Sequence, residues 1–265
     1  RMLSMILGSS SHAFEIMLGT FIAGLALGGL WVKGRIDKLE NPAAFLATMQ
    51  WIMGALAILT LYLYNLCFDL MAGLMSGLTR TEVGYTLFNI GSHLLAIVIM
   101  LPAAFCAGTT LPLITFALLR RGYGEKSIGQ VYACNTVGAI LGVFVATHLA
   151  MPILGLKGLV IFGALVDIAL AVTIFAAIKR PRLVGSAIGL GALLIALTAW
   201  TVQFDPLRMA SGVYRVARIM SADSYQSLYH ADGKTSTVDV IKGGDGRLIL
   251  ITNGKPDASI NPKTD

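Results

Sequence analysis

The sequence predicts an all-α polytopic membrane domain of about six transmembrane helices, followed by a small antiparallel β-ribbon domain. Of its 265 residues, 56% are hydrophobic and 13% are charged, and the mean hydropathy is +0.76. Soluble domains carry about 25% charged residues. The charges are also unevenly placed, because residues 204–265 hold 15 of the 34 charged side chains. We therefore predict a helical membrane domain over residues 1–203 and a β-hairpin domain over residues 204–265.

Six apolar segments are each long enough to cross a bilayer, which takes about 20 helical residues. They cover residues 12–32, 43–66, 85–119, 127–151, 157–178 and 183–203. The third segment would reach roughly 50 Å as a helix and contains Pro102 and Pro112. Since proline lacks an N–H group and clashes with the preceding turn, we expect a kink or a break there.

Pairs of small residues recur four positions apart, which lets helix backbones approach closely in lipid. The pairs are Gly24 with Gly28, Gly138 with Gly142, and Gly185 with Gly189. We interpret them as helix-packing positions, within the chain or between copies of it in an oligomer.

The charges between the apolar segments predict an orientation. Three loops on one side, residues 33–42, 120–126 and 179–182, hold nine Lys or Arg residues, whereas the opposite loops hold Arg80 and Lys157. Lysine and arginine are enriched in cytoplasmic loops. We therefore expect a multi-pass protein of the bacterial inner membrane with these three loops in the cytoplasm and the C-terminal segment in the periplasm.

The C-terminal segment favours β-strands. Residues 235–241 and 248–251 are rich in Thr, Val, Ile and Leu, and the intervening sequence GGDG, residues 243–246, is typical of a hairpin turn. A hairpin of this size is marginally stable by itself, so we expect it to pack on another element.

Four polar residues inside apolar segments are intramembrane candidates: Glu15, Asn135, His148 and Asp167. Ionisable groups are costly in a bilayer and therefore suggest function. Glu15 has an alternative reading as a hydrated or paired group near the interface, three residues from His12. We interpret Asn135 and His148 as interhelical hydrogen-bonding groups rather than ligands.

The sequence contains no pattern that indicates a metal site, a nucleic-acid-binding surface, a nucleotide-binding motif or a catalytic triad. The three cysteines, Cys67, Cys106 and Cys134, and the four histidines have no metal-binding spacing, so no metal is predicted. The net charge of +6 comes from clusters at the ends of apolar segments, which argues against nucleic-acid binding. No G-x-G-x-x-G nucleotide motif occurs, and no spacing suggests a catalytic triad.

Seven segments together resemble bacterial membrane-bound spermidine synthase-like proteins of the polyamine aminopropyltransferase family. GSSSHAFEIMLGTFIAGLALGGLW, LPAAFCAGTTLPLI, GQVYACNTVGAILGVF and MPILGLKG resemble the membrane half of these proteins. SGVYR, YHADGKTSTVDV and LITNGKPDAS resemble the small N-terminal β-domain of an aminopropyltransferase.

The resemblance implies transfer of an aminopropyl group from decarboxylated S-adenosylmethionine to an amine such as putrescine. It implies amine-binding positions at Tyr229, Thr237, Asn253 and Asp257. Soluble members have Gln at the positions of Thr237 and Asp257 and Asp at the position of Asn253, so the sequence departs from their pattern. Asp257 by itself is either a ligand for a cationic amine or a solvated turn carboxylate.

In that family the β-domain precedes a Rossmann-like domain that binds the nucleotide co-substrate, and another span precedes the sequence RMLS. We therefore expect a longer native protein, with no cofactor site in these residues and with the bilayer and a small amine as partners. A membrane transporter and a non-catalytic membrane scaffold remain alternative functions.

Overall fold

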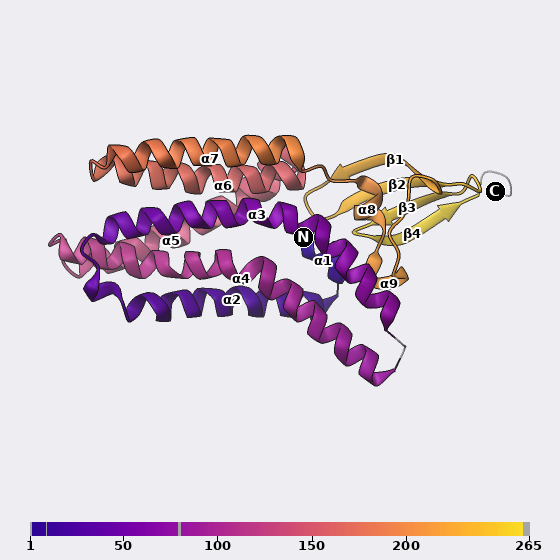
Figure 1. The fold of residues 1–265 in the computed structure, drawn as a ribbon, viewed down its shortest axis with the longest axis horizontal. Helices are drawn as coiled ribbons and strands as arrows, with labels where there is room; N and C mark the ends of the chain where they lie inside the picture. Colours follow the sequence, from indigo (N-terminus) through magenta and orange to yellow (C-terminus); the bar gives the residue numbers. More distant parts are fainter. Residues whose placement is uncertain (1, 9, 79–80, 262–265) are drawn as a thin grey trace.

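The computed structural model describes residues 2–8, 10–78 and 81–261, which form a bundle of long helices with a β-sheet at one end (Figure 1). The helical elements are α1 (Met2–Leu7), α2 (Ser11–Lys33), η1 (Ile36–Lys38), α3 (Pro42–Gly77), α4 (Glu82–Arg120), α5 (Lys126–Val145), the π-helical η2 (Ala146–Ala150), α6 (Met151–Ala177), α7 (Pro181–Thr201), α8 (Pro206–Ala210) and α9 (Val213–Val216). The strands are β1 (Tyr225–Asp232), β2 (Thr237–Gly243), β3 (Leu248–Thr252) and β4 (Lys255–Ile260).

Local sequence signals set the starts of the long helices. The side chains of Ser10, Asn41 and Thr81 each accept a hydrogen bond from the backbone N–H three residues later, at 3.1, 3.0 and 3.2 Å. These bonds satisfy amide groups that have no partner within the helix. Pro42 and Pro181 stand at the first turns of α3 and α7, where a missing N–H costs nothing.

Within the described residues, five helical segments are long and apolar enough to cross a membrane. They are Ser11–Lys33, Pro42–Gly77, Glu82–Arg120, Lys126–Ala177 and Pro181–Thr201. The predicted long apolar helices followed by a small antiparallel sheet are therefore confirmed, whereas the count of six spans is not. The difference arises because the predicted segments 127–151 and 157–178 form one 52-residue helical stretch.

That stretch contains a reversal at Gly155. Its backbone has φ 65° and ψ −174°, a conformation that is essentially restricted to glycine. Ala177, at the end of α6, lines the same hollow as Arg121, which directly precedes the loop into α5. The stretch therefore begins and ends at the same end of the bundle, with Gly155 at the other.

Helix α4 runs without a break through Pro102 and Pro112 over 39 residues. Figure 1 shows its axis changing direction along its length. This is the kink expected from a proline that cannot donate to the carbonyl one turn earlier.

The small-residue pairs have two different environments. A Cβ atom on Gly24 would lie 2.6 Å from the Cβ of Ala104, and one on Gly28 would lie 2.0 Å from the Phe105 carbonyl oxygen, so α2 and α4 meet nearly backbone to backbone. The other four glycines, Gly138, Gly142, Gly185 and Gly189, have open space at the Cβ position within the described chain. Packing inside the chain thus accounts for the first pair only.

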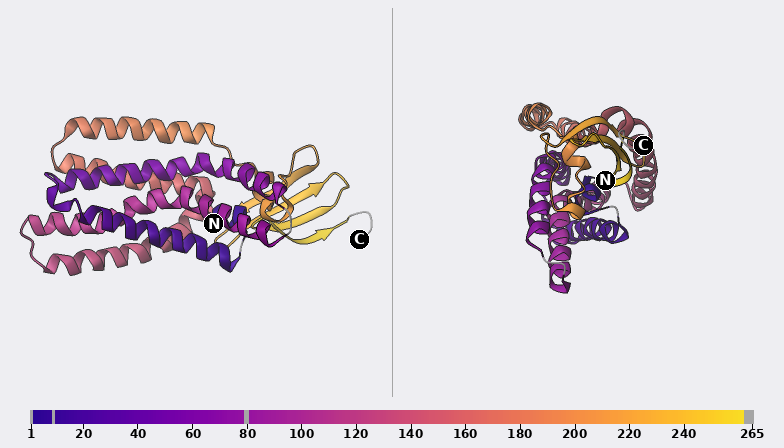
Figure 2. Two further views of the ribbon diagram at one scale, coloured as in Figure 1. Left: turned by 60° about the horizontal axis from the view of Figure 1, so that its bottom comes forward. Right: turned by 90° about the vertical axis from the view of Figure 1, so that its right-hand side faces the viewer.

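The three basic loops lie together at one end of the bundle. Arg120 Nη1 donates to the Leu39 carbonyl oxygen at 2.6 Å, and Arg121 and Ile178 line one hollow. The β-sheet lies at the opposite end, as the two further views confirm (Figure 2).

The strands form one antiparallel meander in the order β1-β2-β3-β4. The predicted hairpin is its centre, with Asp245 Oδ1 accepting the Arg247 N–H at 3.0 Å in the turn. The sheet packs on α8 through Leu207, Ala210, Ile241 and Ile251. The hairpin therefore obtains the packing partners that it needs from α8 and from two further strands.

The segment between the bundle and the sheet belongs to the bundle core. Met209 and Val213 are buried in one apolar cluster with Tyr64 and Phe68 of α3. The sheet is thereby fixed to the end of the bundle rather than joined to it by a free linker.

Candidate functional site: the sheet and its junction with the bundle

The two faces of the sheet differ in burial. Tyr229, Val240, Leu250 and Ala258 are paired across the four strands and form a row on the outer face. Tyr229 is 55% exposed and Leu250 is 39% exposed. The outer face is thus an accessible apolar surface with one aromatic ring.

The inner face carries a cluster of polar side chains, which we call the junction cluster: His230, Asp232, Thr237, Asp239 and Asn253. The His230 Nδ1 and Asp239 Oδ1 atoms are 2.6 Å apart. Thr237 donates its hydroxyl to Asp232 Oδ1 at 2.7 Å, and its N–H to Asn253 Oδ1 at 2.9 Å. Each member therefore contacts at least one other member.

Strand register explains why these residues meet. His230 pairs with Asp239, and Asp232 pairs with Thr237, so two residues from each strand share one face. Asn253 has φ 50° in the turn between β3 and β4, and asparagine tolerates that left-handed conformation better than most residues. Its side chain thereby reaches the first residue of β2.

The junction cluster carries more negative than positive charge. Asp239 is 1% exposed, and its Oδ2 atom has no hydrogen-bond partner among the described residues. The hydrogen bond to Asp239 raises the pKa of His230 above its usual value, although burial partly opposes the shift. A protonated His230 offsets one of the two carboxylates.

The junction cluster also holds the sheet against the helical reversal. Asp232 Oδ2 accepts the backbone N–H of Leu156 at 3.0 Å. This N–H follows Gly155, where the chain leaves helical geometry, so a carboxylate from β1 satisfies an amide that the break exposes.

The structure brings together two of the four residues that the resemblance implied. Thr237 and Asn253 are bonded to each other, but Thr237 is fully buried and can only position Asn253. Tyr229 lies on the outer face, away from them. Asp257 is exposed on β4, with its Oδ1 atom 3.8 Å from Lys255 Nζ.

Three members of the junction cluster were not among the predicted site residues: His230, Asp232 and Asp239. They could have been suspected from the sequence, because residues two positions apart in a strand lie on the same face. This rule places His230 with Asp232 on one face of β1, and Thr237 with Asp239 on one face of β2. Pairing the two strands in register was needed to see that these faces coincide.

The intramembrane candidates are dispersed. Glu15 is exposed on α2, with its Oε2 atom 3.9 Å from His12 Nδ1. Asn135 is exposed on α5, and His148 stacks on Phe144 of its own helical stretch at 4.8 Å. Asp167 is half-buried and accepts a hydrogen bond from Gln50 Nε2 at 3.4 Å.

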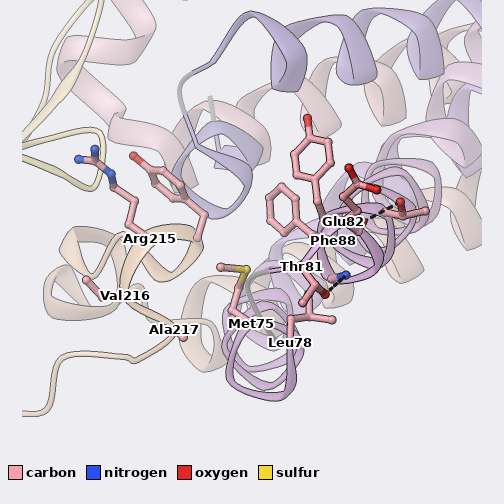
Figure 3. A pocket seen from close by; sticks show the side chains of 12 residues that line it. Met75, Leu78, Thr81, Glu82, Phe88, Arg215, Val216 and Ala217 are labelled. Carbon is pink, nitrogen blue, oxygen red and sulfur yellow. Dashed lines mark hydrogen bonds between the residues drawn. The ribbon is translucent and has the colours of Figure 1, made fainter.

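A wide groove of about 890 Å³ lies beside the sheet, between α9 and the adjoining ends of α3 and α4. Figure 3 shows Arg215, Val216 and Ala217 on one side of it and Met75, Leu78 and Glu82 on the other. Among the described residues, the lining of the groove is mostly apolar with one acidic and one basic side chain, and it contains none of the site residues predicted from the sequence.

Comparison with protein-family models, with curated proteins and with solved structures found no match. The fold alone defines the class: a protein with several helices long and apolar enough to span a membrane, joined to a small antiparallel sheet.

Proposed function

We propose that this chain is the membrane half and the amine-side wall of a spermidine synthase-like aminopropyltransferase of the bacterial inner membrane. The observation that supports it is the four-stranded meander directly after the bundle, where the resemblance implies the β-domain of that family. The accessible row on the outer face of this sheet is the surface offered to the substrate.

The outer face suits the methylene chain of a diamine. Tyr229, Val240 and Leu250 provide adjoining apolar surface, and methylene groups gain roughly 0.8 kcal/mol each when fully buried. Asp257, exposed on the adjoining strand, offers a carboxylate for the distal ammonium group.

In the proposed reaction, a neutral amine of the substrate attacks the aminopropyl carbon of decarboxylated S-adenosylmethionine. A carbon–nitrogen bond forms, the carbon–sulfur bond breaks, and its electron pair neutralises the sulfonium to give methylthioadenosine. The new ammonium then loses a proton to a base. Our proposal assigns only the positioning of the amine to this chain.

For the membrane half we propose six crossings, with α5 and α6 as separate spans on either side of Gly155. The nine cations of the three basic loops then face the cytoplasm, and the sheet faces the periplasm. Cysteine-accessibility labelling at Tyr123 and Ser259, both exposed, tests the two sides; reaction of both sites from the same side would contradict it.

The test of activity uses the intact protein purified from its native membranes and measures methylthioadenosine release from decarboxylated S-adenosylmethionine and putrescine. We expect Tyr229→Ala and Asp257→Asn to raise KM for the amine by about tenfold or more. Asp245→Asn, in the exposed turn between β2 and β3, is the matched control and should leave KM unchanged. Absence of release with putrescine and with other amines would refute the proposed activity.

A further inference from the structure

Inside the bundle, Gln50 of α3 and Asp167 of α6 form a polar pair in which one buried hydrogen-bond acceptor has no partner among the described residues. Gln50 is 9% exposed, and its Nε2 donates to Asp167 Oδ1 at 3.4 Å. Its Oε1 is buried and has no hydrogen-bond partner among the described residues. The pair therefore has surplus acceptors and a carboxylate, and it lacks a donor that would balance them.

The two helices hold this pair at close range. One turn beyond Gln50, a Cβ atom on Gly54 would lie 2.9 Å from the Ala164 carbonyl oxygen and 3.2 Å from the Asp167 Cβ. The backbones of α3 and α6 are thus in near contact beside the pair, which restricts how far either polar side chain can move away.

Gln50 stands at the inner end of a succession of three hollows along α3, α4 and α6. The innermost, about 240 Å³, is lined by Gln50 and Thr110 and shares Leu46, Ile114 and Ile174 with the next, of about 250 Å³. The second shares Ala43, Ala117 and Arg121 with the outermost, of about 230 Å³, which Glu40 and Arg120 also line. The shared walls place the three hollows side by side, with the Gln50 side chain at one end of the row and the basic loops at the other.

We infer that this succession of hollows is a binding site for an alkylammonium ion. Its charged nitrogen donates to Gln50 Oε1, with Asp167 behind the amide as the counter-charge, and its alkyl chain lies in the apolar middle hollow. The site is separate from the sheet and does not depend on aminopropyl transfer.

The residues that line the hollows favour an alkylammonium ion over a metal ion or a lipid acyl chain. A calcium or magnesium ion requires about six oxygen ligands, and the described residues here offer one carboxylate, one free amide oxygen and the Thr110 hydroxyl. A lipid acyl chain would fill the apolar hollows but would leave Gln50 Oε1 without a donor. An ammonium group on an apolar chain satisfies both the acceptor and the walls.

The experiment measures binding of n-hexylamine to the protein in lipid nanodiscs by calorimetry, with the heat of binding to protein-free discs subtracted. We expect saturable binding that Asp167→Asn and Gln50→Leu each weaken by about 10- to 100-fold. Glu15→Gln removes an exposed carboxylate of another helix and should leave the affinity unchanged. n-Hexanol, which has the same chain and no charge, should bind at least about tenfold more weakly than n-hexylamine.

Equal binding of hexanol and hexylamine would overturn the inference and would identify the hollows as acyl-chain grooves. Undiminished hexylamine binding in folded Asp167→Asn would also overturn it. If that variant does not fold, the decision rests on Gln50→Leu together with the comparison of the two ligands in the unmodified protein. Neither measurement requires a nucleotide co-substrate, so failure here is distinct from failure of the proposed transferase activity.

Discussion

Replacement of Gly28 by alanine should separate helices α2 and α4. The added Cβ atom would lie 2.0 Å from the carbonyl oxygen of Phe105 and 3.0 Å from its carbonyl carbon. Ordinary van der Waals contact is at about 3.5 Å, so relief needs a displacement of roughly 1.5 Å. The obstructing atoms belong to the backbone of α4, and no change of rotamer can move them aside.

The magnitude follows from two opposing effects. Overpacking of a close interface costs about 1–3 kcal/mol, and a displacement of this size also loosens the contacts on either side. Alanine favours the helix over glycine by about 1 kcal/mol, which offsets part of that cost. We expect a net loss of up to about 2 kcal/mol in the free energy of unfolding, which is the overpacking cost less the gain in helix preference. The contacts that the displacement loosens include those at Gly24 and Gly108, where α2 and α4 also meet.

The assay is reversible unfolding in mixed micelles by titration with sodium dodecyl sulfate. Gly138→Ala is the matched control, since a Cβ there meets nothing within 4 Å in the described chain. This control should be neutral or stabilised by up to about 1 kcal/mol. If Gly28→Ala were as stable as Gly138→Ala, the backbone contact between α2 and α4 would not exist in the membrane protein.

Two further predictions concern the junction cluster. Because the pKa of His230 is raised in the folded protein by its bond to Asp239, the resulting stabilisation is complete below the unfolded pKa of about 6.5 and is lost as pH rises through the folded pKa. Melting of the sheet should therefore shift to lower temperature as the pH rises above about 6.5, and His230→Gln should reduce this dependence; an unchanged profile would show that the pair does not titrate. Asp232→Ala removes the acceptor of the Leu156 N–H, so hydrogen–deuterium exchange at this amide should accelerate by about tenfold or more, whereas Asp257→Ala should not affect it. Equal protection of the Leu156 amide in both variants would contradict the observed contact.

The helical bundle could be predicted from apolar segment length, but the ends of its helices could not. The second predicted span stopped at residue 66, whereas α3 continues to Gly77. The additional turns carry Phe68 and Met71, which are fully buried against other elements, so tertiary packing rather than bilayer thickness sets the length. Hydropathy measures only how apolar a segment is, so it does not predict this packing.

The reversal at Gly155 shows a different limit. The sequence MPILGLKG has a proline and two glycines, which is compatible with a turn, a kink or a continuous helix. The backbone there leaves helical geometry at one residue only, and the exposed amide of Leu156 finds its acceptor 76 positions away in Asp232. A distant partner of this kind leaves no local pattern in the sequence.

The site residues, like the helices, could be predicted only in part from the sequence. Composition and turn chemistry predicted the central hairpin, whereas Thr237 and Asn253 were implied as site residues by the family resemblance. The carboxylates and the histidine around them required the register of β1 against β2, which a bulge between Ser227 and Tyr229 shifts by one residue. The sequence shows no sign of that bulge.

The hydrogen bond from the Leu156 N–H to Asp232 couples the position of β1 to the first turns of α6. Helix α6 begins at Met151 and packs along α3, and its first turns are tied by one carboxylate to the strand that carries His230. A displacement of this end of α6 would therefore move β1 and change the spacing on which the pair between His230 and Asp239 depends.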